Sequence, residues 1–492
     1  MKNLWILLTV MALSAFSCSE PESVMNDGLY SKADGLYGLT NNGYSGGEGD
    51  QYTDFGENPF INASEDPVST FGIDADGASY ANMRGYESDG YRIPPEAVRV
   101  EEFINYFNFD YPDPSSEHVS INSETAVCPW NTEHYLLRIG LKGKELNGDR
   151  PPANFVFLID VSGSMAGEDK IGVLKSGFKR LTEQLTENDR VAIVTYSGSV
   201  SVALESVSGS ETDQIKKAID KLTAGGSTAG GAAMEMAYEI ATDNFIEGGN
   251  NRIVLGTDGD FNVGVSSTKA LIEMVQDFRE LGVFLTICGV GHGNLNESMM
   301  EQVANKGDGS YEYIDNGDQI YKVFVQEYDK FFTVAKDAKI QVSFDPTFVD
   351  SYRLIGYENR ALEDTEFEND TVDAGEIGAS QTITAFYQVV PRGSASGSFG
   401  DLEFRYKRPG QEQSRLLVHS LNNNRDEFAL SSENMRFAAS LAGFGMLLKN
   451  SEYSGEVSYD QVKEWASSAL SYDPFGFREE YIELIDRVRS LD

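Results

Sequence analysis

Residues 154–164 read NFVFLIDVSGS, an apolar run that ends at Asp160 and continues into a short Ser-Gly-Ser loop. A near-continuous apolar run of this length is typical of a strand that is covered on both faces. A helix pattern follows, because apolar residues recur on one helical face between Ile171 and Leu185. A buried strand followed by a helix indicates an α/β fold built on a mainly parallel sheet.

The same alternation continues over residues 153–330. Short apolar runs alternate with amphipathic ones, which is the pattern of strands joined by crossover helices. It predicts an α/β fold with a doubly wound, mainly parallel sheet. We expect strands at 190–196, 201–207 (an edge strand), 252–257, 283–288 and 310–314, and helices at 212–222, 230–243, 268–281, 297–305 and 318–328.

The regions on either side of this domain have different patterns. Residues 60–150 look α-rich up to about residue 112, with a helix opened by Pro94-Pro95, and strand-like afterwards. Residues 331–492 begin with strand patterns. Since strand-rich pieces occur on both sides, we expect them to form one β-sandwich with the α/β domain inserted between adjacent strands, and a domain merely flanked by these regions is the alternative. The chain then ends in helix patterns at 433–449, 459–470 and 478–491.

Polar side chains follow three of the predicted strand ends and helix starts. Asp160, Ser162 and Ser164 stand at i, i+2 and i+4 on one loop, Thr228 opens a helix, and Asp258 ends another buried strand. In an open α/β sheet, ligands bind outside the carboxyl ends of the strands. Oxygen donors without nitrogen or sulfur suit a hard cation. A metal-free loop that uses the same side chains to satisfy its backbone is the alternative.

These residues resemble the metal-ion-dependent adhesion site of von Willebrand factor type A domains, with D-x-S-x-S at 160–164. By resemblance, Ser162, Ser164 and either Thr228 or Asp258 contact the metal directly, and Asp160 acts through water.

Segments outside the α/β domain extend the resemblance. Residues 71–82, 95–102 and 128–131 look like the characteristic segments of bacterial YfbK-type A-domain proteins, and the region after 330 is similar to the C-terminal domain of that group. The resemblance therefore covers roughly residues 60–490.

The first residues look like an export signal. Residues 1–17 have a basic start, a short apolar run and small residues before Cys18. The segment resembles a lipoprotein signal, which implies cleavage before Cys18, lipid attachment there and an outer-membrane or envelope location. An ordinary signal peptide is the alternative. Residues 18–59 are acidic and rich in Gly, so we expect a flexible linker. Whether the protein faces the periplasm or the cell surface stays open.

The charge balance and the metal-ligating residue types exclude several classes of function. Lys and Arg number 39 against 78 Asp and Glu, a net charge of −39, so we expect no nucleic-acid partner. The four histidines lack the spacing of the common zinc hydrolase motifs. For His292 we expect a hydrogen-bonding role in its loop, and a place near the ligand edge of the sheet is the alternative. Cys128 and Cys288 are expected to be free.

A cation held mainly by neutral oxygens stays electrophilic and keeps one position for an outside ligand. We expect that ligand to be an Asp or Glu carboxylate of a protein partner. Mg²⁺ is the first choice of metal, with Mn²⁺ or Ca²⁺ as alternatives. The sequence therefore predicts adhesion or scaffolding of an envelope complex, and no enzymatic activity.

Two other functions stay open. The first is a non-catalytic helper subunit of an AAA-type or metal-inserting machine, which the export signal opposes. The second is a metal-dependent hydrolase, which the lack of an evident general base beside the predicted site opposes.

Overall fold

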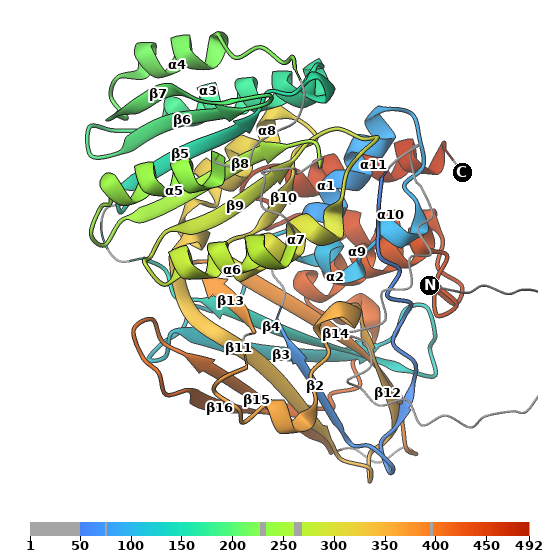
Figure 1. Ribbon diagram of the computed structural model, residues 1–492. Helices are drawn as coiled ribbons and strands as arrows, with labels where there is room; N and C mark the ends of the chain where they lie inside the picture. Colours follow the sequence, from blue (N-terminus) through green and yellow to red (C-terminus); the bar gives the residue numbers. More distant parts are fainter. Residues whose placement is uncertain are drawn as a thin grey trace, which may run out of the picture. The chain divides into compact units, whose positions relative to one another are not determined.

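Strand β5 (Ala153–Asp160) lies inside a six-stranded sheet of order β10-β9-β8-β5-β6-β7 (Figure 1). The computed structural model describes residues 50–491 apart from 74–75, 147, 149, 227–232, 260–267, 373 and 394–396. β5 runs parallel to β6 and β8, and only the edge strand β7 is antiparallel to its neighbour in this described sheet. The doubly wound, mainly parallel sheet is therefore confirmed. Its other strands are β6 (Arg190–Tyr196), β7 (Val200–Ser208), β8 (Asn250–Thr257), β9 (Phe284–Gly289) and β10 (Tyr311–Tyr313).

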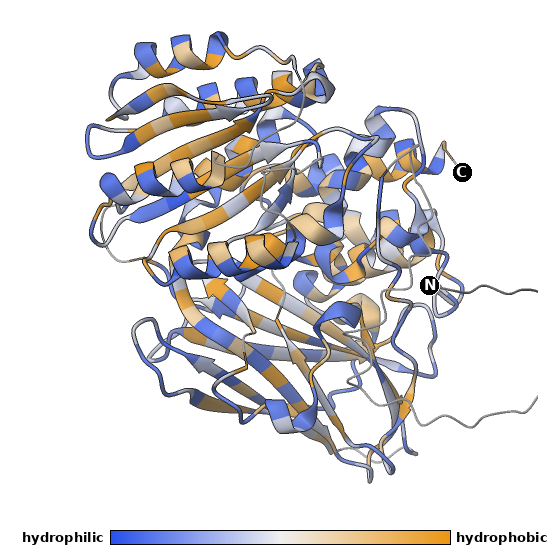
Figure 2. Cartoon of the chain, in the orientation of Figure 1, coloured by the Kyte–Doolittle hydropathy of each residue, from blue (hydrophilic) through white to orange (hydrophobic). Residues whose placement is uncertain are grey.

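Helices cover both faces of this sheet, which explains the continuous apolar run of β5. Phe155, Phe157 and Ile159 lie in one buried cluster, and Val156 and Leu158 lie in another. The strands of the sheet are accordingly apolar along much of their length (Figure 2). The first cluster includes residues of α3 (Val173–Thr182), α4 (Thr212–Asp220) and α8 (Gly317–Tyr321), and the second includes residues of α5 (Ala233–Asp243), α6 (Thr268–Arg279) and α7 (Glu297–Lys306).

A β-sandwich is built from both sides of the α/β domain, as expected. Strands β3 (Val119–Val127) and β4 (Tyr135–Gly143) precede the domain, and β4 pairs with β14 (Thr382–Pro391), which follows it. β4 and β11 (Thr333–Phe344) flank the insertion and lie in different sheets. One sheet has the order β1-β12-β14-β4-β3 and the other β13-β11-β15-β16, with β2 also paired to β11. The remaining strands are β1 (Ile61–Asn62), β2 (Val68–Gly72), β12 (Val349–Ile355), β13 (Gly375–Gly378), β15 (Ser398–Lys407) and β16 (Arg415–Asn422).

The two sheets share one apolar core. Phe344 of β11 stacks on Tyr352 of β12 with ring centroids 4.1 Å apart, and it meets Tyr387 of β14 edge-on. Offset and edge-on aromatic pairs of this kind add to the stabilisation that burial provides. Aromatic contacts across the sandwich therefore hold together strands that are far apart in the sequence.

The α-rich prediction for residues 60–112 needs correction. This region begins with β1 and β2, which pair with strands about 270–290 residues later, so no local pattern marked them. The helices are α1 (Ala78–Ser88) and α2 (Val100–Asn105). Pro94-Pro95 starts a 3₁₀ turn, and α2 begins five residues after Pro95. Within the predicted helix 318–328, only the residues that belong to α8 are α-helical.

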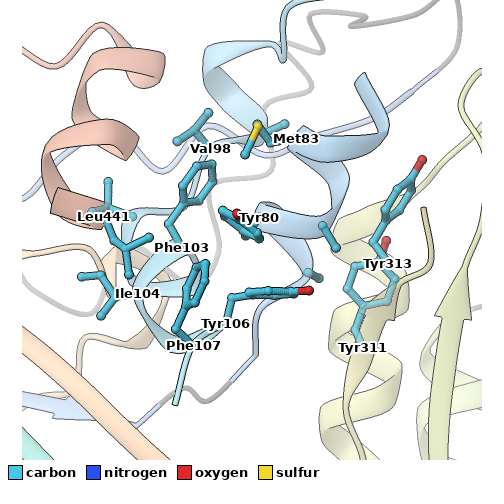
Figure 3. Packing of buried hydrophobic residues seen from close by; sticks show 14 of the residues in the cluster. Tyr80, Met83, Val98, Phe103, Ile104, Tyr106, Phe107, Tyr311, Tyr313 and Leu441 are labelled. Carbon is cyan, nitrogen blue, oxygen red and sulfur yellow. The ribbon is translucent and has the colours of Figure 1, made fainter. Parts of the chain in front are cut away.

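The chain ends in α9 (Glu433–Lys449), α10 (Tyr459–Ser467) and α11 (Phe477–Arg489). An aromatic cluster joins them to the rest of the fold: Tyr80, Phe103 and Phe107 pack between Leu441 of α9 and the tyrosines of β10 (Figure 3). α9 is mostly buried in this core. Across the described ranges, no helix combines the length and apolar character that a membrane span needs.

Candidate metal centre

The loop after β5 brings three of the predicted ligands together. Asp160 is the last residue of β5 and is fully buried. The Ser162 backbone N–H donates to Asp160 Oδ1 over 2.7 Å, and the hydroxyl oxygens of Ser162 and Ser164 lie 3.0 Å apart. Ser162 is buried, but Ser164 is exposed. The loop thus holds a carboxylate and two hydroxyls close together, with one side open to solvent.

Strand pairing brings the fourth predicted ligand to the same edge. β5 and β8 are parallel, and the register pairs Ile159 with Gly256. Asp160 therefore stands beside Thr257, and Asp258 follows directly. Neighbouring strands lie about 4.8 Å apart, so this register places the two aspartates at the same edge of the sheet. Asp258 is 1% exposed. The approach of Asp258 to the serine pair itself stays a prediction.

Two carboxylate oxygens of these aspartates are buried without a hydrogen bond of good geometry from any described residue: Asp160 Oδ2 and Asp258 Oδ1. The Tyr196 hydroxyl also interacts with the Asp160 carboxylate. Burial raises the pKa of Asp160, and the nearby Asp258 carboxylate raises it too, against the lowering effect of the Ser162 hydrogen bonds. Buried polar atoms without partners are uncommon, because each one costs desolvation energy. A hard divalent cation would satisfy both oxygens, so this donor set fits the metal that the sequence predicts.

Thr228 and Cys18 lie outside the described residues, so their predicted roles are untested. The loop before Thr228 does contact the serine loop, since the Gly163 N–H donates to the Gly226 carbonyl over 3.1 Å and the Gly225 N–H to the Val161 carbonyl over 2.8 Å. Within the described ranges, no group of three or more His, Cys, Asp or Glu side chains could hold a metal ion. The candidate site has only two carboxylates and relies on hydroxyls for the rest.

Sequence reasoning missed one charged residue of the site. Lys170 lies in a wide helical turn, Glu168–Gly172, and its Nζ donates to Asp258 Oδ2 over 3.0 Å. π-helical turns of this kind are rare and frequent at functional sites. The signal that could have found Lys170 is its position six residues after Ser164, close behind the ligand loop.

The loop between β9 and α7 packs against Gly259, the residue that follows Asp258. Gly259 has φ +104°, and a Cβ added there would lie 2.4 Å from the Asn294 carbonyl oxygen, so only Gly allows this close approach. The buried Asp50 carboxylate accepts hydrogen bonds from the N–H groups of Gly293 (2.7 Å) and Leu295 (2.9 Å). The folded region therefore includes residues 50–59, which the sequence pattern assigns to the linker.

His292 and the cysteines follow the sequence-based expectations. His292 Nε2 lies 3.0 Å from the Tyr313 hydroxyl, in a hydrogen bond that ties its loop to β10. Cys128 and Cys288 are both free and buried. Burial raises the pKa of the Cys128 thiol to about 12, which leaves it protonated and unreactive at neutral pH.

Comparison with known proteins places most of the chain in one family. A profile of the von Willebrand factor type A domain matches residues 154–326, a profile described as von Willebrand factor matches 47–138, and the C-terminal profile of "Uncharacterized protein YfbK" matches 329–491. The protein of that name from Escherichia coli K12 is 41% identical over 465 residues, which cover 89% of this chain and 80% of the relative. This chain belongs to the YfbK family of von Willebrand factor type A domain proteins.

Other relatives share only part of this YfbK-type chain. Human "Inter-alpha-trypsin inhibitor heavy chain H3" is 28% identical over 169 residues, which cover 32% of this chain and 18% of that protein. A solved structure titled "von Willebrand factor type A from Catenulispora acidiphila" covers 77% of this chain and 91% of its own, with 14% identity and a TM-score of 0.42. The family is thus established by the YfbK relative.

Proposed function

We propose that this chain is an exported lipoprotein that binds a protein partner through a divalent cation, in adhesion or in scaffolding of an envelope complex. The cation, with Mg²⁺ as first choice, would be held by Asp160, Ser162, Ser164, Thr228 and Asp258. The partner would supply an Asp or Glu carboxylate to the remaining position. Membership of the von Willebrand factor type A family supports a protein-interaction role of this kind.

One observation carries the proposal. Asp160 Oδ2 and Asp258 Oδ1 are buried without good hydrogen bonds, while Ser164 on the same loop is exposed. A dication in this place would be bound by two carboxylates and would still face solvent on the Ser164 side. Because the chain carries a net charge of −39, an acidic partner is repelled at long range. A local metal contact would then supply the attraction, and the surrounding surface the specificity.

Loss of the Asp160 carboxylate is expected to release the partner. Proximity labelling in intact cells would compare the full-length wild type, Asp160→Ala and Asp169→Asn. Asp169 is an exposed acid in the neighbouring turn, so its variant controls for charge alone. We expect the same labelled proteins with wild type and Asp169→Asn, and loss of at least one with Asp160→Ala and after chelation of divalent cations. Unchanged labelling in Asp160→Ala cells would refute the metal-mediated contact.

The proposed lipid anchor at Cys18 can be tested separately. Cys18→Ser removes the thiol that the resemblance assigns to acylation, so the protein should move from the membrane pellet to the soluble fraction. Cys128→Ser is the matched control, because Cys128 is a buried thiol of the folded unit. Fractionation followed by mass measurement of the N-terminal peptide checks both location and lipid. A Cys18→Ser protein that stays in the membrane pellet would contradict the anchor.

A further inference from the structure

Lys170 binds only one of the two oxygens of the Asp258 carboxylate. Its Nζ donates to Oδ2 over 3.0 Å, and the Lys170 and Asp258 side chains are 12% and 0% exposed. Oδ1 is the oxygen left without a good hydrogen bond from a described residue. One ammonium and one metal ion can therefore bind the same carboxylate at once, each on its own oxygen.

The backbone beside it fixes the position of the Lys170 stem. A Cβ added at Gly291 would lie 2.5 Å from Lys170 Cε and 2.6 Å from Cγ, so the lysine stem lies directly against the Gly291 backbone. Gly291 belongs to the loop between β9 and α7 that also packs behind Gly259. Because the stem is held on this side, the ammonium is directed at Oδ2.

The lysine changes the charge of the site. Asp160 and Asp258 carry two negative charges, and Lys170 returns one positive charge, which leaves −1. A bound divalent cation then gives a net charge of +1 instead of zero. A positive site holds the metal less tightly, because the ammonium repels it, and attracts an outside carboxylate more strongly.

We propose that Lys170 is a positioning residue that trades metal affinity for affinity toward an anionic ligand. It turns Asp258 Oδ1 toward the metal position and keeps the occupied site positive, which favours an acidic protein ligand over a neutral one. This inference rests on the metal-dependent function proposed above, and it names the charge class of ligand that the same site selects.

The test uses purified full-length protein in detergent and Mn²⁺ as the metal probe. Free Mn²⁺ is counted by electron paramagnetic resonance for wild type, Lys170→Met, Lys170→Arg and Lys179→Met. Lys179 pairs with Asp220 at the surface of α3, so its variant is the matched control for loss of a lysine. Acetate is the anion probe, and its binding to the Mn²⁺-loaded protein is measured by the relaxation of water protons.

We expect Lys170→Met to bind Mn²⁺ about tenfold more tightly, or more than that, because one repulsive charge is gone. The same variant should bind acetate at least about threefold more weakly. Lys170→Arg keeps the charge and should stay near wild type in both measurements, as should Lys179→Met.

The outcomes separate this inference from the proposed function. If wild type binds no Mn²⁺ at the site, the metal-dependent function itself fails. If wild type binds Mn²⁺ but Lys170→Met binds it equally or less tightly, the charge role of Lys170 is refuted while the metal site stands. Equal changes in Lys170→Met and Lys170→Arg would also refute it, because packing and not charge would then be responsible. Thermal unfolding of each metal-free variant confirms that the fold is retained.

Discussion

Asp160→Asn is expected to weaken divalent-cation binding strongly and, at the same time, to stabilise the metal-free protein. Asn keeps the oxygen that accepts the Ser162 N–H, so the loop can retain its shape. It removes the negative charge of Asp160, which lies buried beside Asp258. Burial disfavours this charge and so raises the pKa of Asp160. The affinity for Mg²⁺ or Mn²⁺ should fall by about 100-fold or more, because the variant lacks one of the two charged ligands.

Thermal unfolding with and without metal measures both effects. In wild type, a metal concentration of about 100 times the dissociation constant would stabilise the protein by about 2.7 kcal/mol. In Asp160→Asn the metal-dependent shift should vanish, and the metal-free transition should lie above that of wild type. Asp169→Asn, which changes an exposed acid close by, should keep the wild-type shift.

Weaker metal binding together with higher metal-free stability distinguishes a metal site from a loop that binds no metal. If Asp160 only satisfied the backbone of a metal-free loop, Asp160→Asn would be neutral or destabilising and metal would shift neither protein. A metal-dependent shift that persists in Asp160→Asn would show that the ion binds elsewhere.

Local sequence patterns predicted the parts of the fold that depend on local physics. The strand 190–196 and the helix 433–449 have the predicted bounds, because their apolar periodicity and end signals lie within a few residues. Asp160, Ser162, Ser164 and Asp258 were identifiable because the strand-end rule places such residues at one edge of the sheet. Their meeting needs only correct strand order.

Contacts between distant residues were not predictable in this way. β2 is specified by its register with β11, where Phe71 pairs with Ile340, and a five-residue stretch carries no such information. Lys170 reaches Asp258 across 88 positions, and its charge looks like that of a surface lysine until the loop at Gly291 is in place. In each case the partner is supplied by tertiary structure, which periodicity does not encode.

The second large effect is a pH dependence of stability at Glu297, the first residue of α7. Glu297 is 1% exposed, and neither of its carboxylate oxygens has a hydrogen bond of good geometry to a described residue. Arg99, just before α2, lies 3.5 Å away and also pairs with Glu102 and Glu301. Burial raises the pKa of Glu297 to about 7, although Arg99 acts in the opposite direction. Glu301 and Asp50 are the further acids that raise it.

The direction of this pH dependence follows from the pKa of Glu297 in the unfolded and the folded protein. An unfolded glutamate ionises near pH 4.5, whereas folded Glu297 holds its proton up to about pH 7. The folded state is therefore favoured below about pH 4.5, and this contribution is lost as the pH rises toward 7. The shift corresponds to about 3 kcal/mol at most. The free energy of unfolding should accordingly fall between pH 5 and pH 8.

Glu297→Gln should reduce this slope and stabilise the protein at pH 8, because the amide has a similar shape and carries no charge. Urea unfolding at pH 5, 6, 7 and 8 measures the effect, with Glu273→Gln, an exposed acid on α6, as control. An unchanged slope in Glu297→Gln would mean that another group carries it, such as Glu376 of β13, whose pKa burial also raises to about 7. Arg99 and Glu102 belong to the flanking helical region, and Arg360, which pairs with Glu301, follows β12 of the sandwich. A reduced slope in Glu297→Gln would therefore show that protonation of Glu297, where the inserted domain meets its flanking regions, contributes to the pH dependence of stability.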